Sequence, residues 1–101
     1  MHTLGQVIKS KRVEKGLLLR QVSAFLDIDQ AILSKIEKGD RKPTKDNINK
    51  LSEILEIDRT QLMVQFLSEK IAYEIADEDC APQVLKVAED KIKYIKALNK
   101  Y

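Results

Sequence analysis

A cluster of basic side chains between positions 35 and 45 is the first candidate for chemistry in this sequence. Five basic residues stand here against Glu37 and Asp40, namely Lys35, Lys38, Arg41, Lys42 and Lys45. The 101-residue chain carries a formal net charge of only +2, so the cluster is a local feature. A basic patch on a nearly neutral protein is a weak signature of phosphate binding. A solvated charged loop explains the same charges, and charge alone slightly favours that interpretation.

Three other groups of ligating or nucleophilic residue types do not form a recognisable site. His2 is the single histidine, and it has no cysteine or histidine partner at the spacing of metal ligands. Asp77, Glu78 and Asp79 lack the alternating spacing and the glycine of a calcium loop. Cys80 lies in the acidic segment DEDCAP, where an unreactive loop cysteine is the simpler interpretation and a redox switch the alternative. The sequence therefore predicts no enzyme, no metal site and no cofactor.

The composition is typical of a small helical protein. It is 44% hydrophobic and 34% charged, with only three glycines and two prolines. The longest apolar runs have three residues, so no segment predicts a membrane span, and the N-terminal residues lack the apolar centre of a signal peptide. A single cysteine cannot form an intrachain disulfide. We expect a cytoplasmic protein.

Hydrophobic spacing and capping residues predict six helices and no strand. The expected ranges are about 4–15, 19–26, 30–38, 45–55, 59–76 and 82–98. Thr3 and Gln6 have the spacing of a capping box. The other expected N-caps are Asp29, Thr44 and Asp58, and the expected helix ends lie at Gly16, Asp27 and Gly39. The predicted core consists of Leu4, Ile8, Val22, Leu26, Ile28, Leu33, Ile36, Ile48, Leu51 and Leu55.

The stretch VSAFLDIDQAILSKIEKG, residues 22–39, has the pattern of two short helices joined by a four-residue turn and ended by glycine. The segment IKSKRVEKG precedes this stretch, LSKIEKGDRKP overlaps its end, and NINKLSEIL follows it. Together these segments resemble the Cro and phage-repressor type of helix-turn-helix, the XRE-like family. The resemblance covers about residues 3–57. It implies an all-α fold, a five-helix repressor-like domain, here with a lengthened fifth helix and an extra C-terminal helix.

The resemblance implies which residues contact DNA. In this fold the second helix of the motif lies in the major groove, and its N-terminal side chains reach the base edges. The implied base-reading residues are Gln30, Ala31, Ser34 and Lys35. The implied phosphate-binding residues are Lys38, Arg41 and Lys42, which give affinity without sequence information. Arg12 and Glu37 match a partly buried ion pair of the family, a structural role.

The start of the second helix departs from the family pattern. The family usually has a polar cap and then a glutamine that contacts a phosphate, but this chain has Leu18 and Leu19. Leu17 is explained as a hydrophobic staple against Val22. Leu18 and Phe25 are seven residues apart and share a helical face, so we expect a second apolar surface that another segment covers.

Residues 58–101 exceed what the minimal domain needs, so we divide the chain into a DNA-binding domain, 1–57, and a C-terminal extension, 58–101. Helix 82–98 has apolar residues at nearly heptad spacing. We expect the extension to form a homodimer interface and to cover the Leu18 and Phe25 surface. The predicted interface residues are Leu62, Phe66, Leu67, Ile71, Ile92 and Ile95. The alternative is that the last helix only enlarges the core of one monomer.

Taken together, the sequence predicts a sequence-specific DNA-binding transcription regulator, either a repressor or an autoregulated controller. It would bind an inverted repeat of double-stranded DNA as a homodimer. The alternative is an antitoxin or a protein-interaction module that binds a protein partner through the C-terminal helices.

Overall fold

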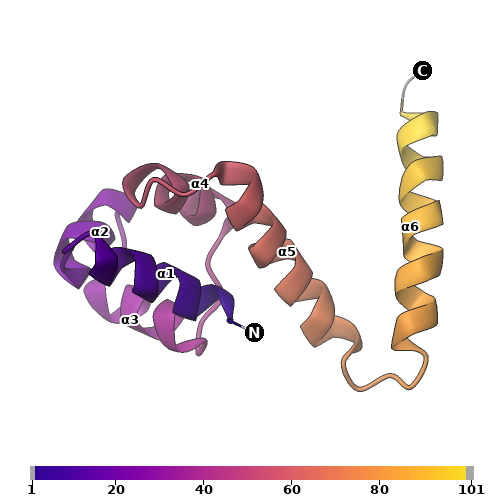
Figure 1. Ribbon diagram of the computed structural model, residues 1–101, viewed down its shortest axis with the longest axis horizontal. Helices are drawn as coiled ribbons and strands as arrows, with labels where there is room; N and C mark the ends of the chain where they lie inside the picture. The colour runs from indigo at the N-terminus through magenta and orange to yellow at the C-terminus, as the bar shows by residue number, and fades with distance from the viewer. Residues whose placement is uncertain (1, 100–101) are drawn as a thin grey trace. The chain divides into compact units, whose positions relative to one another are not determined.

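The computed structural model describes residues 2–99, and it contains six helices and no strand within them (Figure 1). The helices are α1 (Leu4–Glu14), α2 (Leu19–Leu26), α3 (Gln30–Lys38), α4 (Lys45–Ile54), α5 (Arg59–Ile75) and α6 (Ala81–Leu98). The all-α prediction is confirmed, and every predicted helix end lies within one residue of the observed one. The chain divides into two compact units, Met1–Lys70 and Ile71–Tyr101.

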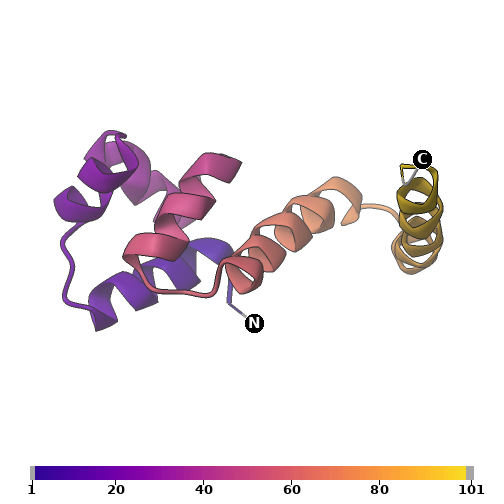
Figure 2. The same ribbon diagram turned by 90° about the horizontal axis from the view of Figure 1, so that it is seen from above.

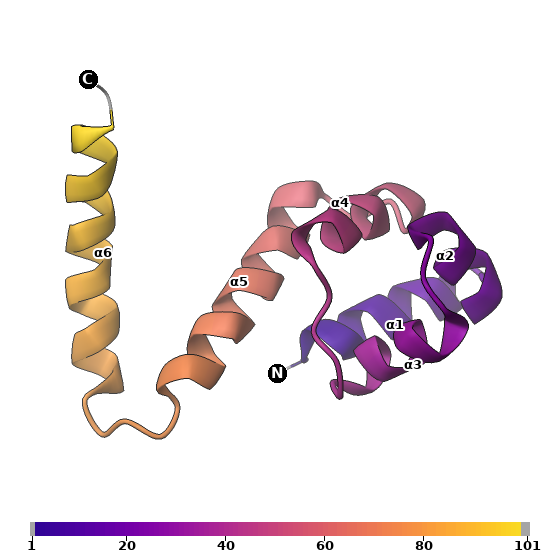
Figure 3. The same ribbon diagram turned by 180° about the vertical axis from the view of Figure 1, so that it is seen from behind.

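The first unit surrounds a single hydrophobic core. Helix α1 packs against α3, and α2 packs against both α3 and α4. Figure 3 shows α1 and α3 side by side. The buried apolar residues are Leu4, Ile8, Val22, Leu26, Leu33, Ile36, Ile48, Leu51, Leu55, Leu62 and Phe66. All but one of the core residues predicted from spacing are in this set, and Ile28 is half-buried and packs against it.

Three helices of the first unit, α1, α4 and α5, begin at side chains that accept hydrogen bonds from free backbone N–H groups. Thr3 forms the predicted capping box with Gln6, and Thr44 forms a second one with Asn47. The Asp58 carboxylate accepts a 3.0 Å hydrogen bond from the backbone N–H of Gln61, as expected for an N-cap. Asp29 stands at the N-cap position of α3, as predicted. Its side chain makes no capping hydrogen bond, so the predicted capping contact is wrong.

The first four helices all end in the same way, with one residue in the left-handed backbone region. These residues are Gly16 (φ 69°), Asp27 (φ 57°), Gly39 (φ 85°) and Glu56 (φ 54°). In each case the next backbone N–H donates to the carbonyl five residues earlier, as Ile28 does to Ser23 at 3.0 Å. This is the Schellman motif, which satisfies carbonyls at the helix end and turns the chain sharply. Figure 2 shows the short turn that this motif makes between α4 and α5.

The N-terminal half of α5 closes the core of the first unit. Leu62 and Phe66 are only 1% and 8% exposed. The Glu69 carboxylate accepts a 2.7 Å hydrogen bond from the backbone N–H of Leu4, which fastens α5 to the start of α1. The compact unit therefore extends to Lys70, beyond the boundary expected after residue 57.

This packing corrects part of the predicted dimer interface. Leu62 and Phe66 face their own core, so they are not on a surface that a second chain could reach. Their helical spacing is the same for a core stripe and for an interface stripe, and the sequence pattern does not distinguish the two. The other four predicted interface residues, Leu67, Ile71, Ile92 and Ile95, are exposed.

The second unit contains the last turn of α5 and the whole of α6. Helix α6 is straight and uninterrupted (Figures 1 and 3), with a proline in its first turn, as predicted for Pro82. None of its residues is buried. Large apolar side chains are exposed along it, at Val84, Leu85, Val87, Ile92, Tyr94, Ile95 and Leu98.

Candidate functional site

One face of α3 is turned away from the core and carries the four residues predicted to read bases. Leu33 and Ile36 hold the opposite face of the helix in the core. Because α3 has about 3.6 residues per turn, the side chains of the four predicted residues share the outer face. Gln30, Ala31 and Lys35 are exposed, and Ser34 is half-buried. The face offers an amide, a methyl group, a hydroxyl and an ammonium in the first turns of one helix.

The turn between α2 and α3 holds this face in a defined direction. Asp27 adopts the left-handed conformation, which ends α2 after Leu26. Ile28 then packs against the core, so the turn is fixed from inside. Two short helices joined by a turn that is anchored at both ends keep a constant angle. Helix α3 is therefore presented as a rigid unit.

The basic residues predicted to bind phosphates lie at the end of α3 and in the loop that follows it. Lys38 is the last residue of α3, and Arg41 and Lys42 follow the left-handed Gly39. All three side chains are exposed. Pro43 is buried at the far end of the loop, which anchors the backbone that carries them. The reading face and the basic loop are thus neighbours along the chain and share one supporting helix.

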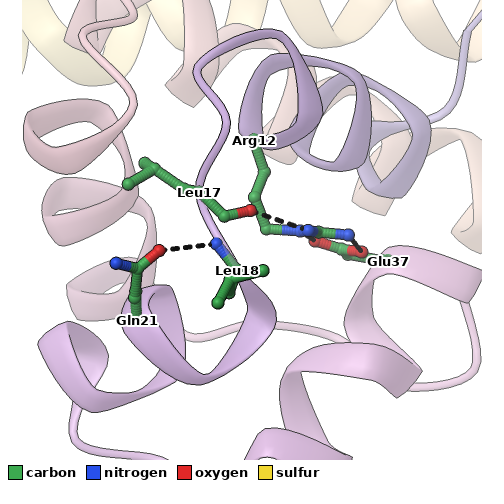
Figure 4. A network of polar contacts seen from close by, with 5 residues as sticks. All are labelled: Arg12, Leu17, Leu18, Gln21 and Glu37. Atoms are coloured by element: carbon green, nitrogen blue, oxygen red, sulfur yellow. Dashed lines mark hydrogen bonds and ion pairs between the residues drawn. The ribbon is translucent and has the colours of Figure 1, made fainter.

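A buried ion pair joins α1 to α3 (Figure 4). Arg12 donates from Nε to Glu37 Oε2 at 2.7 Å and from Nη2 to Glu37 Oε1 at 3.1 Å. Its Nη1 donates to the backbone carbonyl of Leu17 at 2.9 Å. The two side chains are only 11% and 4% exposed. A two-point pair of this kind fixes orientation as well as distance, so Arg12 connects α1, α3 and the segment that leads into α2.

The start of α2 has only half of a capping box. The backbone N–H of Leu18 donates to Gln21 Oε1 at 2.7 Å (Figure 4), but the Leu18 side chain has no acceptor to return. The capping role of Gln21 was missed in the sequence, because the first member of the usual Ser/Thr-x-x-Glu/Gln pattern is absent. Leu17 and Leu19 pack against the core. Leu18 and Phe25 are 48% and 41% exposed, so the helices of the first unit leave this small apolar surface open.

Gly5 is a second feature that sequence reasoning missed. A Cβ atom at this position would lie 2.6 Å from the carbonyl oxygen of Ile36 and closer still to that of Glu37. Helix α1 therefore approaches the backbone of α3 as closely as only a glycine allows. A single glycine inside a helical pattern is the signal that could have indicated this contact.

Among residues 2–99, no group of three His, Cys, Asp or Glu side chains is placed to hold a metal ion. Over the same residues, no helix is both long and apolar enough to cross a membrane.

Comparison with known proteins identifies the architecture. The family model described as "Helix-turn-helix" matches residues 8–62, more than half of the chain. No curated protein matches the sequence. Among solved structures, the clp gene regulator ClgR from Corynebacterium glutamicum is 24% identical with a TM-score of 0.57, over 84% of this chain and 88% of that one. The SinR protein/SinI protein complex contains a chain that is 22% identical with a TM-score of 0.54, over 94% of this chain and 99% of that one. At these identities the two structures show a shared fold.

Proposed function

The chain belongs to the Cro and phage-repressor-like (XRE) helix-turn-helix family of DNA-binding transcription regulators, and we propose that it is a repressor that binds an inverted repeat as a homodimer. The family is one of DNA-binding regulators and not of enzymes. In the proposed role the protein acts in the cytoplasm and blocks polymerase at a promoter, including the promoter of its own gene.

The exposed face of α3 is the observation that carries this proposal. Gln30 can pair with the N6 and N7 atoms of adenine, and Lys35 can donate to O6 or N7 of guanine. Ala31 can pack against the methyl group of thymine. These side chains project from the first turns of a helix whose other face is held in the core. We assign base reading to Gln30, Ala31, Ser34 and Lys35.

We assign phosphate binding to the basic residues that follow. Lys38, Arg41 and Lys42 lie beside the reading helix and are exposed. Phosphate contacts fix the position of a protein on the duplex and give most of the salt dependence of binding. The family usually makes a phosphate contact at the start of α2, and Leu19 cannot make it. These three residues would therefore supply a larger share of the phosphate contacts.

A homodimer is the assembly that fits this binding mode. Helix-turn-helix proteins commonly bind two half-sites about one helical turn apart, and a two-fold axis in the protein then matches an inverted repeat. We assign Leu67, Ile71, Ile92 and Ile95 to the dimer interface, because they are large apolar residues left exposed on α5 and α6. We also propose that the Leu18 and Phe25 surface is covered in the dimer. The test of that cover is Phe25→Lys, which should weaken the dimer.

The experiment that tests the proposal compares DNA from upstream of the gene with scrambled DNA, at low and at near-physiological salt. Tighter binding to the upstream DNA that persists at the higher salt supports base reading. Gln30→Ala and Lys35→Ala should each remove about 1–3 kcal/mol of discrimination between the two DNAs. Lys38→Ala should weaken binding to both DNAs and reduce the salt slope by about one. Lys86→Ala, an exposed lysine on α6, is the matched control. Equal binding to both DNAs that disappears with salt contradicts the proposal.

A second candidate function is binding of a protein partner through the C-terminal helices, as in an antitoxin or an interaction module. Two observations favour it. The apolar side chains of α6 are exposed, and one of the similar structures is a complex of two different proteins, SinR and SinI. If Lys35→Ala and Lys38→Ala both leave all DNA affinity intact, this second function becomes the better one.

A further inference from the structure

We propose that α6 pairs antiparallel with α6 of a second copy, about a two-fold axis that passes close to residue 90. This inference rests on the homodimer proposed above and specifies how its two chains meet. It assigns the surface, the direction and the register of the contact.

The first argument is that α6 needs a partner. It is an 18-residue helix with no buried residue, whereas helices in proteins owe most of their stability to the packing of an apolar face. Leu85, Ile92 and Ile95 are 51%, 52% and 53% exposed. Together with two alanines and an asparagine they form a stripe with steps of four and three residues, the repeat of a two-helix seam. The stripe consists of Ala81, Leu85, Ala88, Ile92, Ile95 and Asn99.

The second argument is that this stripe is symmetric about residue 90. Ala88 and Ile92 are equally distant from that position on either side, and so are Leu85 and Ile95. A two-fold axis at residue 90 therefore places Ala88 of each chain opposite Ile92 of the other. Small residues opposite large ones interlock and fill the space between two helices. Leu85 then lies opposite Ile95 of the second copy, which continues the same contact towards both ends.

The parallel arrangement fits the same residues less well. It would place Ala88 of each chain opposite Ala88 of the other, which leaves a gap at the centre of the seam. Along the edge of the seam it would bring Lys91 next to Lys96 of the second copy, a repulsive contact. In the antiparallel arrangement the same edge brings Val84 next to Leu98 of the second copy, which extends the apolar contact. Packing at the centre and at the edge therefore both favour the antiparallel direction.

Charge near the axis is the weak point of this arrangement, and it gives a specific expectation. Lys91 lies on one edge of the seam, next to Lys91 of the second copy. Glu89 lies on the other edge, next to Glu89 of the second copy. Glu89 already pairs within its helix with Lys93, at 3.7 Å. Lys91 has no such pair in its own helix among residues 2–99, so Lys91→Leu is expected to tighten the dimer several-fold by removing the repulsion and adding apolar contact.

The decisive experiment uses cysteines placed on either side of the axis in the full-length chain. Two chains are prepared in a Cys80→Ser background, one with Ala88→Cys and the other with Ile92→Cys and a tag that makes it larger. The chains are mixed, re-equilibrated and oxidised gently, and the cross-linked species are separated by size. A disulfide requires Cα atoms within about 7 Å, so it reports direct neighbours. We expect the mixed species to dominate, with little cross-linking of either chain to itself.

The control and the other outcomes separate this inference from the proposed homodimer. Asp90→Cys lies on the far side of the helix, so it should not cross-link. Cross-linking of each chain only to itself would show a parallel pair and overturn the register. No cross-linking, with a dimer found by sedimentation at the same concentration, would overturn the α6 pairing but leave the homodimer. A monomer in sedimentation at concentrations that saturate the DNA, alone and bound to DNA, would overturn both.

Discussion

Gln21 Oε1 accepts a 2.7 Å hydrogen bond from the backbone N–H of Leu18, but the Leu18 side chain has no oxygen to accept a hydrogen bond from the backbone of α2 in return. One of the two reciprocal bonds of a capping box is thus present and the other is missing. The free backbone N–H groups in the first turn of α2 lose a partner that Ser or Thr would supply. The first turn of α2 is therefore less stable than it could be, at a place where the chain has an exposed leucine.

Restoring the missing acceptor should stabilise the protein. We expect Leu18→Thr to raise the free energy of unfolding by about 1 kcal/mol, because the threonine hydroxyl can accept a hydrogen bond from the first turn. Leu18→Val is the matched control, since valine has the shape of threonine without the acceptor. Urea unfolding at a protein concentration too low for self-association provides the measurement. Equal stability of the two variants would show that the missing cap does not change the free energy of unfolding.

Cutting the ion pair between α1 and α3 should be costly. Arg12 makes three hydrogen bonds and is 11% exposed, so Glu37→Ala would leave a poorly solvated charge. We expect this change to reduce the free energy of unfolding by about 3–5 kcal/mol. The double variant Arg12→Met with Glu37→Ala should recover part of the loss, because no unpaired charge remains. A double-mutant cycle measured by thermal or urea unfolding checks this, and additive effects of the two single variants would contradict it.

The close approach at Gly5 should tolerate no side chain. Because a Cβ atom there would press on the backbone carbonyls of Ile36 and Glu37, α1 and α3 would have to move apart. We expect Gly5→Ala to reduce the free energy of unfolding by about 1–3 kcal/mol, although alanine is the better helix former. Ser10→Ala, at an exposed position of the same helix, is the control and should be neutral or slightly stabilising. A stabilised Gly5→Ala variant would show that the two helices are not in close contact.

The contact between Lys15 and Glu56 predicts a titration behaviour. The Lys15 ammonium lies 2.9 Å from the Glu56 carboxylate, and this hydrogen bond and its charge lower the pKa of Glu56 below the ordinary value. A lowered folded-state pKa means that the ionised group favours folding above the ordinary glutamate pKa. That contribution is lost as the pH falls through the folded-state value. Glu56 is exposed, so salt should screen the effect.

The measurement is a pH titration of the Glu56 carboxyl carbon by NMR. Lys15→Met should move the pKa of Glu56 back towards the ordinary value, and high salt should do so in part. Lys9→Met changes a lysine that does not contribute to the shift and is the control. An unchanged titration curve for Glu56 in the Lys15→Met variant would contradict the assignment.

The helices and most of the core could be predicted from the sequence, because local signals determine them. Capping residues such as Thr3, and turn residues such as Gly39, act within a few positions of the helix ends that they set. Contacts between distant segments could not be predicted in this way. The bond from Leu4 to Glu69 and the approach of Gly5 to α3 depend on how the helices pack. The same limit explains why Leu62 and Phe66 were placed in an interface rather than in the core.

The way α5 closes the core decides where this protein can be shortened. A fragment cut to the limits of the matching family model, residues 8–62, would keep Leu62 but remove Phe66, Glu69 and the first turn of α1. Its core would be open to water on one side, and poor expression of such a piece would say nothing about DNA binding. A fragment that ends at Lys70 retains every buried apolar side chain. It is therefore the shortest sensible starting point for work on the DNA-binding unit alone.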